Sequence, residues 1–232
     1  MVRKEIWVMN LSKVQEFFDY SKINMPVHII GCGAIGSTLC DQLARIGVTN
    51  FHLYDFDHVE PHNISNQNFL KTDIGKEKVK VCAEMIMNIN EDATVIVHPE
   101  GLQAPYTIPE GGLICLCVDS IELRRDILVA NQYNPTVHAF TDFRMRLTDA
   151  QHYLAVRSDS KKTSQLLASM NFSHEDAVKD TPVSACGIAL SVRYTVETIV
   201  ALGVANIVKM WQKNDTHFLI VNNMLTPDIV AM

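Results

Sequence analysis

The sequence lacks any pair of cysteines in the C-x-x-C pattern, although it contains six cysteines. Structural zinc sites usually draw two ligands from each such pair, so we expect no structural zinc. Cys115 and Cys117 alternate to one face of an apolar run, which is typical of small core residues in a reducing compartment. The remaining cysteines are Cys32, Cys40, Cys82 and Cys186.

Long apolar runs and an excess of positive charge are absent as well. No run approaches the ~20 residues that cross a bilayer, and the first residues show no apolar core followed by a small-residue cleavage site. The net charge of −6 does not favour binding to nucleic acid. We therefore expect a cytoplasmic protein with neither a membrane nor a nucleic acid as partner.

The sequence also lacks internal repeats, linkers and low-complexity tracts, so its 232 residues are expected to form a single domain. Strand-like and helix-like segments alternate along its first half, which predicts an α/β, Rossmann-like fold with a mostly parallel sheet flanked by helices. The expected strands of this half cover 27–30, 51–54, 94–98 and 113–118, and the expected helices cover 10–20, 34–46, 73–90 and 120–133.

The second half of the sequence has a different pattern. β-rich runs at 136–140, 145–156 and 217–221 predict antiparallel strands. Residues 157–183 are polar and charged, which predicts an irregular, mobile crossover segment. A long helix is expected over 185–213.

Three glycines follow the first expected strand in the G-x-G-x-x-G pattern: Gly31, Gly33 and Gly36. The first permits a tight turn, the second lets a phosphate approach the backbone, and the third lets helix and strand pack closely. The helix that opens at Ala34 offers free N–H groups and a partial positive charge to an anion. This strand–turn–helix context predicts nucleotide binding, with a purely structural turn as the alternative.

Two carboxylates, Asp55 and Asp57, lie at the end of the second expected strand. Asp55 follows the glycines by about 20 residues, where a carboxylate accepts hydrogen bonds from ribose hydroxyls. Asp57 is expected near a metal or the turn. A carboxylate that only caps a loop is the alternative for Asp55, and NAD and ATP fit these residues equally well.

Two further residues favour ATP. Lys78 opens an expected helix, where its ammonium group can reach triphosphate oxygens. Asp119 follows an apolar strand at the carboxyl edge of the sheet, where it can hold Mg²⁺ on the phosphates. Other lysines of the region are expected on a solvated helix face: Lys71, Lys76 and Lys80. An NAD-dependent oxidoreductase would leave several polar residues without a role: Asp57, Asn63, Gln67 and Lys78.

The run IIGCGAIGSTLCDQLARIGVTNFHLYDFDHVEPHNISNQ resembles the ThiF/MoeB/HesA family, the bacterial relatives of ubiquitin-activating E1 enzymes. The resemblance covers about residues 25–150, the expected nucleotide-binding core, and includes the glycine turn, D-F-D, N-x-x-x-Q, G-x-x-K and the strand before Asp119. It implies an adenylyltransferase that binds MgATP and the C-terminal Gly-Gly of a small β-grasp protein, ubiquitin-like or a sulfur carrier. Such an enzyme transfers AMP to the terminal carboxylate and releases pyrophosphate.

The resemblance also assigns roles. Gly31 and Gly33 would face phosphate, and Asp55 would hold the ribose. Asn63 and Lys78 would contact the phosphates, and Asp119 would bind Mg²⁺. The ATP site of the family is completed near a two-fold interface, which implies a homodimer or a related partner subunit. The full expected nucleotide site comprises Gly31, Gly33, Ala34, Gly36, Asp55, Asp57, Asn63, Asn66, Gln67, Lys78 and Asp119.

One departure from the family pattern concerns catalysis. The arginine that usually precedes Gln67 and reaches the ATP of a partner subunit is Asn66 in this sequence. Asparagine cannot replace that charge, so Arg124, Arg125 or a partner would have to supply it. A catalytically weakened member, acting as a scaffold or as one half of a heterodimer, is the alternative.

Cys186 is the candidate nucleophile, alongside Lys78 and Asp119 as candidate catalytic residues. It follows the polar segment 157–183 and starts the expected long helix, where a helix N-terminus would favour the thiolate. The alternative is a small residue that packs this helix onto the sheet. If Cys186 is the nucleophile, the segment before it is expected to become ordered over the bound tail of the carrier protein.

Overall fold

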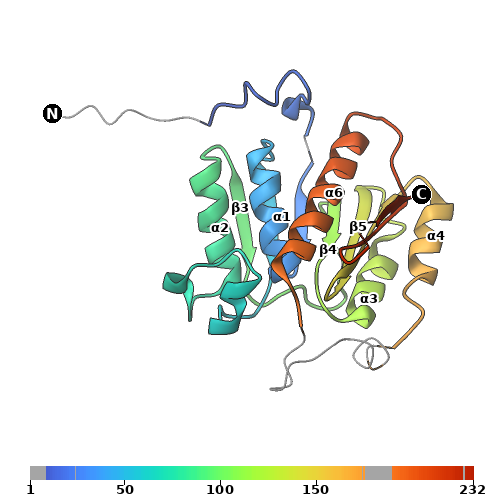
Figure 1. Ribbon diagram of the computed structural model, residues 1–232. Helices are drawn as coiled ribbons and strands as arrows, with labels where there is room; N and C mark the ends of the chain where they lie inside the picture. Colours follow the sequence, from blue (N-terminus) through green and yellow to red (C-terminus); the bar gives the residue numbers. More distant parts are fainter. Residues whose placement is uncertain (1–8, 24, 174, 176–189, 227) are drawn as a thin grey trace.

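The computed structural model describes residues 9–23, 25–173, 175, 190–226 and 228–232 (Figure 1). The described strands form one eight-stranded sheet in the order β3-β2-β1-β4-β5-β6-β7-β8. Their bounds are β1 (Val27–Ile30), β2 (Asn50–Tyr54), β3 (Thr94–His98), β4 (Gly112–Leu116), β5 (Val137–Arg146), β6 (Asp149–Val156), β7 (Leu219–Asn223) and β8 (Asp228–Ala231).

The pairing changes once along this order, from parallel to antiparallel. Strands from β3 to β5 pair in parallel, and the pairs β5–β6, β6–β7 and β7–β8 are antiparallel. β1 and β4 lie in the middle of the parallel part and are buried along their whole length, as expected for strands covered on both faces. The predicted fold class, a mostly parallel sheet with antiparallel strands in the second half, is confirmed.

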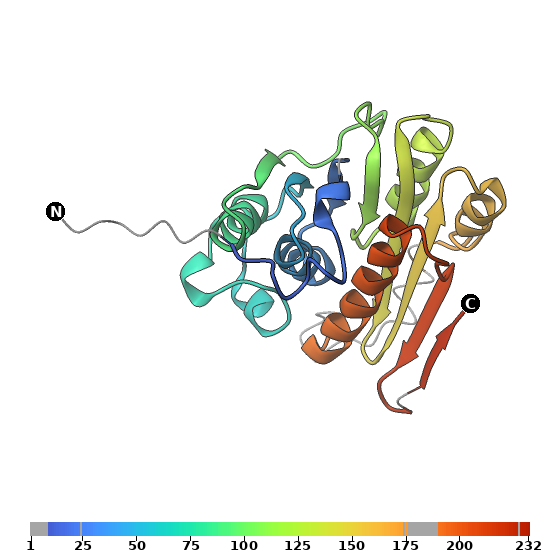
Figure 2. The same ribbon diagram turned by 90° about the horizontal axis from the view of Figure 1, so that it is seen from above.

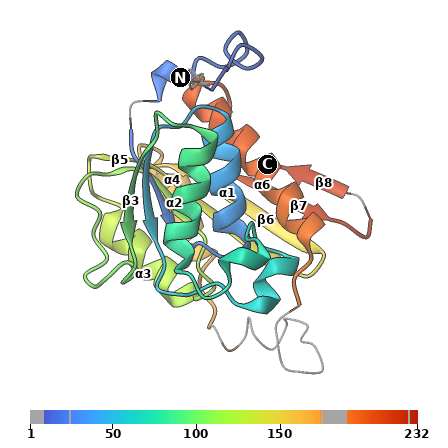
Figure 3. The ribbon, with the colours of Figure 1, turned by 90° about the vertical axis from the view of Figure 1, so that its left-hand side faces the viewer.

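Helices cover both faces of the sheet (Figures 2 and 3). On one face lie α1 (Ala34–Arg45), α2 (Lys78–Ile89) and α6 (Arg193–Trp211), and their apolar side chains share a core with Ile29 and Leu53. On the other face lie α3 (Ile121–Asn131) and α4 (Ser160–Ala168), which share a core with Ile30 and Leu116. Neighbouring residues of β1 thus point into different cores, because side chains alternate along a strand.

The helix expected over 10–20 is wrong. Residues 12–17 form turns, and a short 3₁₀ helix, Tyr20–Lys22, follows. Asn10 accepts a hydrogen bond from the Ser12 amide, and Asp19 accepts one from the Ser21 amide. Such local side-chain acceptors compete with helical hydrogen bonds.

Two other helix boundaries differ from the prediction. α2 begins at Lys78 rather than at residue 73, because a 3₁₀ helix, Lys71–Asp73, and Gly75 with φ +88° interrupt the helical spacing. α6 begins at Arg193, and residue Ser191 before it pairs with Leu147 as an isolated bridge. The part of the expected helix over 185–189 lies outside the described residues.

The irregular structure expected for 157–183 is wrong for its first part, which forms α4. Asp159 caps this helix by accepting a hydrogen bond from the Lys162 amide, and Leu166 and Met170 are fully buried against the sheet. The mobility expected for the rest of the segment stays a prediction. β8 was not expected from the sequence. None of the helices in the described ranges combines the length and apolarity required to span a bilayer.

Candidate functional site

The glycine turn joins β1 to α1 at the carboxyl edge of the sheet. Gly31 has φ +97°, and a Cβ there would lie 2.9 Å from the backbone of Cys117, just after β4. A Cβ on Gly36 would lie 1.9 Å from the carbonyl oxygen of Gly31. A Cβ on Gly33, by contrast, would meet nothing within 4 Å. Close backbone contacts thus leave no room for a side chain at Gly31 or Gly36. Gly33, the N-cap of α1, borders open space.

Asp55 lies directly behind this turn. Its Oδ2 accepts a 2.6 Å hydrogen bond from the amide of Cys32, and its Oδ1 accepts a 2.8 Å bond from the amide of Asp57. The side chain is only partly buried. Because each carboxylate oxygen has two lone pairs, Asp55 is held in place and still keeps acceptor capacity for a ligand hydroxyl.

Asp57 and Lys78 form an ion pair between the end of β2 and the start of α2. The Nζ of Lys78 lies 2.9 Å from Oδ2 of Asp57, and the amide of Lys78 donates to the Asp57 carbonyl oxygen. The lysine is 7% exposed, whereas the aspartate side chain is 53% exposed. The lysine is therefore fixed in one position, and its carboxylate partner faces solvent. The other three lysines of this region are exposed, as expected: Lys71, Lys76 and Lys80.

The loop that carries Asn63, Asn66 and Gln67 packs against both α1 and α6. Asn63 is buried, and its Oδ1 accepts from the Glu60 amide. The amide of Asn68 donates to the buried hydroxyl of Ser37 in α1. The side-chain oxygens of Asn66 and Gln67 are buried without a hydrogen-bond partner among the described residues.

Arg193, the first residue of α6, contacts the same loop and was not expected from the sequence. Its Nη1 donates a 2.8 Å bond to the carbonyl oxygen of Gln67, and its Nη2 donates to the side-chain oxygen of Asn68. These partners are 126 and 125 residues away in sequence. The sequence offered only a basic residue inside a helical run, which is no signal for such a contact.

Asp119 lies beyond β4 at the same edge of the sheet, and it is exposed. Its Oδ1 accepts a 2.8 Å bond from the amide of Ser120, and Ser120 caps α3 by accepting from the Leu123 amide. The helix cap thus fixes the start of α3 and leaves the Asp119 carboxylate open to solvent.

Neither arginine considered as a substitute for the one missing at Asn66 is available for that role. Arg124 is buried and donates to the carboxylate of Asp142 and to the carbonyl oxygens of Leu116, Val118 and Phe143. Arg125 donates to two carbonyl oxygens that follow α4: Met170 and Phe172. That expectation is corrected, because both guanidinium groups hold the protein's own backbone together.

The cysteines described by the structure are packed into the core. Cys115 is fully buried and Cys117 packs against the same core, which confirms the expectation for this pair. Burial raises the pKa of both thiols above the usual range, and it raises the pKa of the Cys40 thiol to about 11. Cys186 lies outside the described residues, so its role as a nucleophile stays a prediction.

The burial of these thiols leads to a test of Cys186. We expect excess iodoacetamide to leave the core cysteines of the folded protein unmodified, because the thiolate is the reactive form and neutral buried thiols react poorly. The five are Cys32, Cys40, Cys82, Cys115 and Cys117. Peptide mass spectrometry before and after unfolding would measure this. Rapid labelling of Cys82 in the native protein would contradict the expectation, and early labelling confined to Cys186 would mark it as the reactive thiol.

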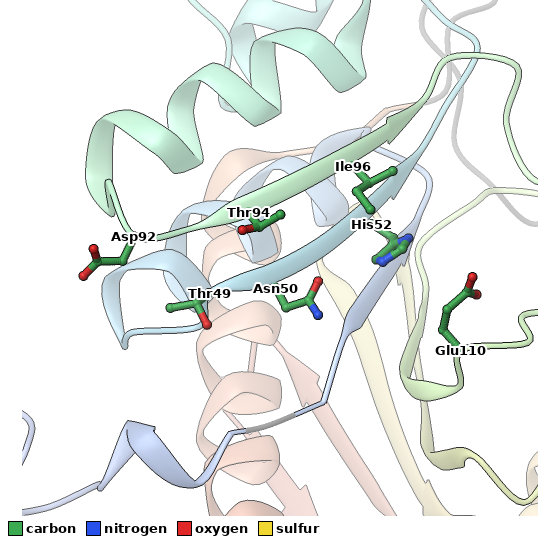
Figure 4. A pocket seen from close by; sticks show the side chains of 7 residues that line it. All are labelled: Thr49, Asn50, His52, Asp92, Thr94, Ile96 and Glu110. Carbon is green, nitrogen blue, oxygen red and sulfur yellow. The ribbon is translucent and has the colours of Figure 1, made fainter.

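A cavity of about 440 Å³ lies at the opposite end of the strands. Figure 4 shows its lining side chains on β2, β3 and the adjoining loops, on the sheet face away from α2. They are Thr49, Asn50, His52, Asp92, Thr94, Ile96 and Glu110. None of the residues predicted from the sequence for a nucleotide site is among them, and ligands of open α/β sheets bind at the carboxyl ends of the strands. The glycine turn therefore remains the candidate site.

Comparison with curated proteins finds partial matches to activating enzymes. The chain is 30% identical over 143 residues to ubiquitin-like modifier-activating enzyme 5 of Drosophila mojavensis, covering 55% of this chain and 36% of that protein. For the Drosophila melanogaster protein of the same name, identity is 30% over 139 residues, with coverage of 53% and 34%. The chain thus spans about a third of the length of these relatives.

Solved structures and a family model match almost the whole chain. PaaA aligns with a TM-score of 0.71 at 17% identity, covering 92% of this chain and 74% of that chain. Escherichia coli MccB, solved with ATP, aligns with a TM-score of 0.68 at 20% identity, covering 92% and 65%. At these identities the structures show a common fold alone. The model of the ThiF family matches residues 12–232, and the chain therefore belongs to the ThiF family.

Proposed function

We propose that this protein is an ATP-dependent adenylyltransferase that activates the C-terminal glycine carboxylate of a small ubiquitin-like or sulfur-carrier protein. The observation that carries the proposal is the open space at Gly33, at the N-terminus of α1, with Asp55 fixed behind it by the Cys32 amide. Free N–H groups at a helix start attract phosphate, and a strand-end carboxylate binds ribose. MccB, which shares the fold, has been solved with ATP and with AMPCPP together with MccA.

The charged residues at this edge fit a triphosphate. Lys78, held in place by Asp57, would act as a point charge on the phosphates. Asp119, open to solvent, would hold Mg²⁺, which commonly binds one or two carboxylates together with substrate phosphates. The ion would supply further neutralisation of phosphate charge. The fit rests on the chemistry of these residues: a solvent-exposed carboxylate, Asp119, follows β4, and an ammonium group held in one position, Lys78, starts α2.

The proposed reaction needs little proton transfer. A terminal carboxylate is already ionised at neutral pH, so its oxygen can attack the α-phosphorus directly. A carboxylate oxygen–phosphorus bond forms, the bond between the α-phosphorus and the bridging oxygen breaks, and pyrophosphate leaves with the electron pair. Because two anions must approach each other, positioning and charge neutralisation carry the catalysis. We therefore expect Lys78 and Asp119 to act as electrostatic groups, not as acid or base.

A second candidate function is a catalytically weakened scaffold or one subunit of a heterodimer. It is favoured by Asn66 in place of the expected arginine, since Arg124 and Arg125 are both engaged within the fold. An active homodimer is the alternative arrangement. Light scattering, together with pyrophosphate exchange by the protein alone, would separate the two.

Calorimetry and isotope exchange test the proposal. We expect the protein to bind MgATP and not NAD, and to catalyse ATP–pyrophosphate exchange when the matching β-grasp protein is added. Asp119→Asn should lower the exchange rate about 100-fold, which corresponds to ~2.7 kcal/mol, because a neutral amide holds Mg²⁺ more weakly than a carboxylate does. Asp126→Asn is the matched control: it removes an exposed carboxylate of α3, which the proposal gives no role, and should leave the rate unchanged. NAD binding without MgATP binding would refute the proposal, and full exchange by Asp119→Asn would refute the metal role.

A further inference from the structure

Arg193 joins two segments that are far apart in the sequence. It is the first residue of α6, and its guanidinium group donates to Gln67 and Asn68 in the loop after the 3₁₀ helix Pro61–Ser65. Glu197, one helical turn further on, accepts from its Nε at 2.7 Å. The carboxylate thus sets the orientation of the guanidinium plane toward the loop.

The contact requires the shape of arginine. Two different Nη atoms reach two different acceptors, a backbone carbonyl and a side-chain amide oxygen, while Nε binds the glutamate. A lysine ammonium group is a single centre and cannot reproduce this planar fork. The side chain of Arg193 is 37% exposed, so burial of apolar surface is not its main contribution.

The same loop leads directly to the glycine turn. The Asn68 amide donates to Ser37 Oγ at 3.0 Å, and the Ser37 amide donates to the carbonyl oxygen of Gly33. The side-chain oxygens of Asn66 and Gln67 have no partner among the described residues, so neither oxygen holds the loop through a hydrogen bond there. A continuous chain of hydrogen bonds therefore runs from Arg193 through Asn68 and Ser37 to Gly33.

We propose that Arg193 is a positioning residue of the nucleotide site, which fixes the loop 66–68 against α1 and so sets where Gln67 and the first turn of α1 meet the phosphates. The inference rests on the proposed function. The guanidinium group of Arg193 binds the carbonyl oxygen of Gln67, the residue after Asn66, where the family pattern has an arginine in place of Asn66. The group comes from α6 rather than from the loop itself, and it acts through Asn68 and Ser37.

Arg193→Gln tests the role by calorimetry with MgATP. We expect the Kd for ATP to rise about tenfold or more, because small displacements of a positioning group are costly, whereas the unfolding temperature should change little. Arg193→Lys should recover only part of the affinity, since it keeps the charge and loses the fork. Arg45→Gln is the matched control: Arg45 pairs with Asp41 at 2.9 Å within α1, is 62% exposed, and should leave the Kd unchanged.

A double-mutant cycle with Asn68→Ala shows whether Arg193 affects ATP binding through Asn68 or independently of it. If Arg193 acts through Asn68, the two single variants should weaken ATP binding to a similar degree, and the double variant should be no weaker than either. Independent, additive losses would overturn the proposed route. The cycle compares affinities, so a uniform loss of stability would not imitate this result.

Hydrogen exchange provides a readout without any nucleotide. The amides of Asn66, Gln67 and Asn68 are hydrogen-bonded in the structure, and they should exchange faster in Arg193→Gln than in the wild type or Arg45→Gln. If the wild type does not bind MgATP at all, the proposed function fails. If it binds MgATP and Arg193→Gln binds equally well, or if the loop amides keep their protection, the inference about Arg193 fails while the proposed function stands.

Discussion

Gly36→Ala should destabilise the protein by ~3 kcal/mol or more, although alanine is ordinarily the better helix residue. The reason is a main-chain clash. A Cβ at this position of α1 would lie 1.9 Å from the carbonyl oxygen of Gly31 and 2.9 Å from its carbonyl carbon. Neither atom can rotate away as a side chain would. Relief requires α1 to move off β1, which would open the core beneath Leu39 and Ile29.

Gly33→Ala should have the opposite profile. Its added Cβ meets nothing within 4 Å, so the unfolding temperature should stay near that of the wild type. If phosphate occupies the space above Gly33, the methyl group should nevertheless weaken MgATP binding by about tenfold or more, or ~1.4 kcal/mol. The pair of variants thus separates packing from ligand contact within one turn.

Thermal unfolding and calorimetry would check both variants. For a chain of this size, ~3 kcal/mol corresponds to a fall of about 6–12 °C in the unfolding temperature. Stability of Gly36→Ala equal to the wild type would show that helix and turn pack more loosely than described. Unchanged ATP affinity of Gly33→Ala would exclude the turn as the phosphate site.

Asp142→Asn should lower the free energy of unfolding by ~3–5 kcal/mol, the range seen when one partner of a buried ion pair is removed. Asp142 on β5 is fully buried. It pairs with Arg124 from α3, and its Oδ2 lies 2.6 Å from Nε of Arg144. Without the carboxylate, two guanidinium groups lose their only anionic partner among the described residues, and Arg124 is itself buried.

Asp41→Asn is the control for this substitution. Asp41 pairs with an exposed arginine one turn away on α1, and such pairs contribute only about 0.3–0.5 kcal/mol. Chemical denaturation of both variants would give the two free energies of unfolding. A loss below about 1 kcal/mol for Asp142→Asn would mean that water or local rearrangement compensates the two arginines.

The parallel half of the fold and its glycine turn follow closely from the sequence. The spacing of Gly31, Gly33 and Gly36 after the first strand predicts the turn, and the structure shows a close backbone contact at Gly31 and at Gly36 and open space at Gly33. Asp55 could be placed because the carboxyl ends of neighbouring parallel strands share one edge.

Residues whose partners lie far away in sequence could not be placed in this way. Arg193 contacts a loop 126 residues earlier, and no local pattern encodes that pairing. The sequence shows Arg124 only as a basic residue in an amphipathic helix. In the structure its guanidinium group donates to Asp142 and to three backbone carbonyl oxygens. The helix α4 was missed because its few apolar residues, such as Leu166, are outnumbered by polar ones and find their burial only on the sheet.

The pairing of β1 with β4 has a consequence for synthesis of the chain on the ribosome. Ile30 is aligned with Leu116, and the backbone around Cys117 forms one wall of the glycine turn. The turn, complete in sequence by Gly36, therefore cannot reach its final shape until residues near 117 have left the exit tunnel. Until β4 emerges, the edge of β1 that pairs with it has no partner strand, although β2 and β3 precede β4 in the chain. An unpaired strand edge of this kind favours association with other nascent chains. Translation speed between Gly36 and Cys117 thus sets how long this edge of β1 stays open in the emerging chain.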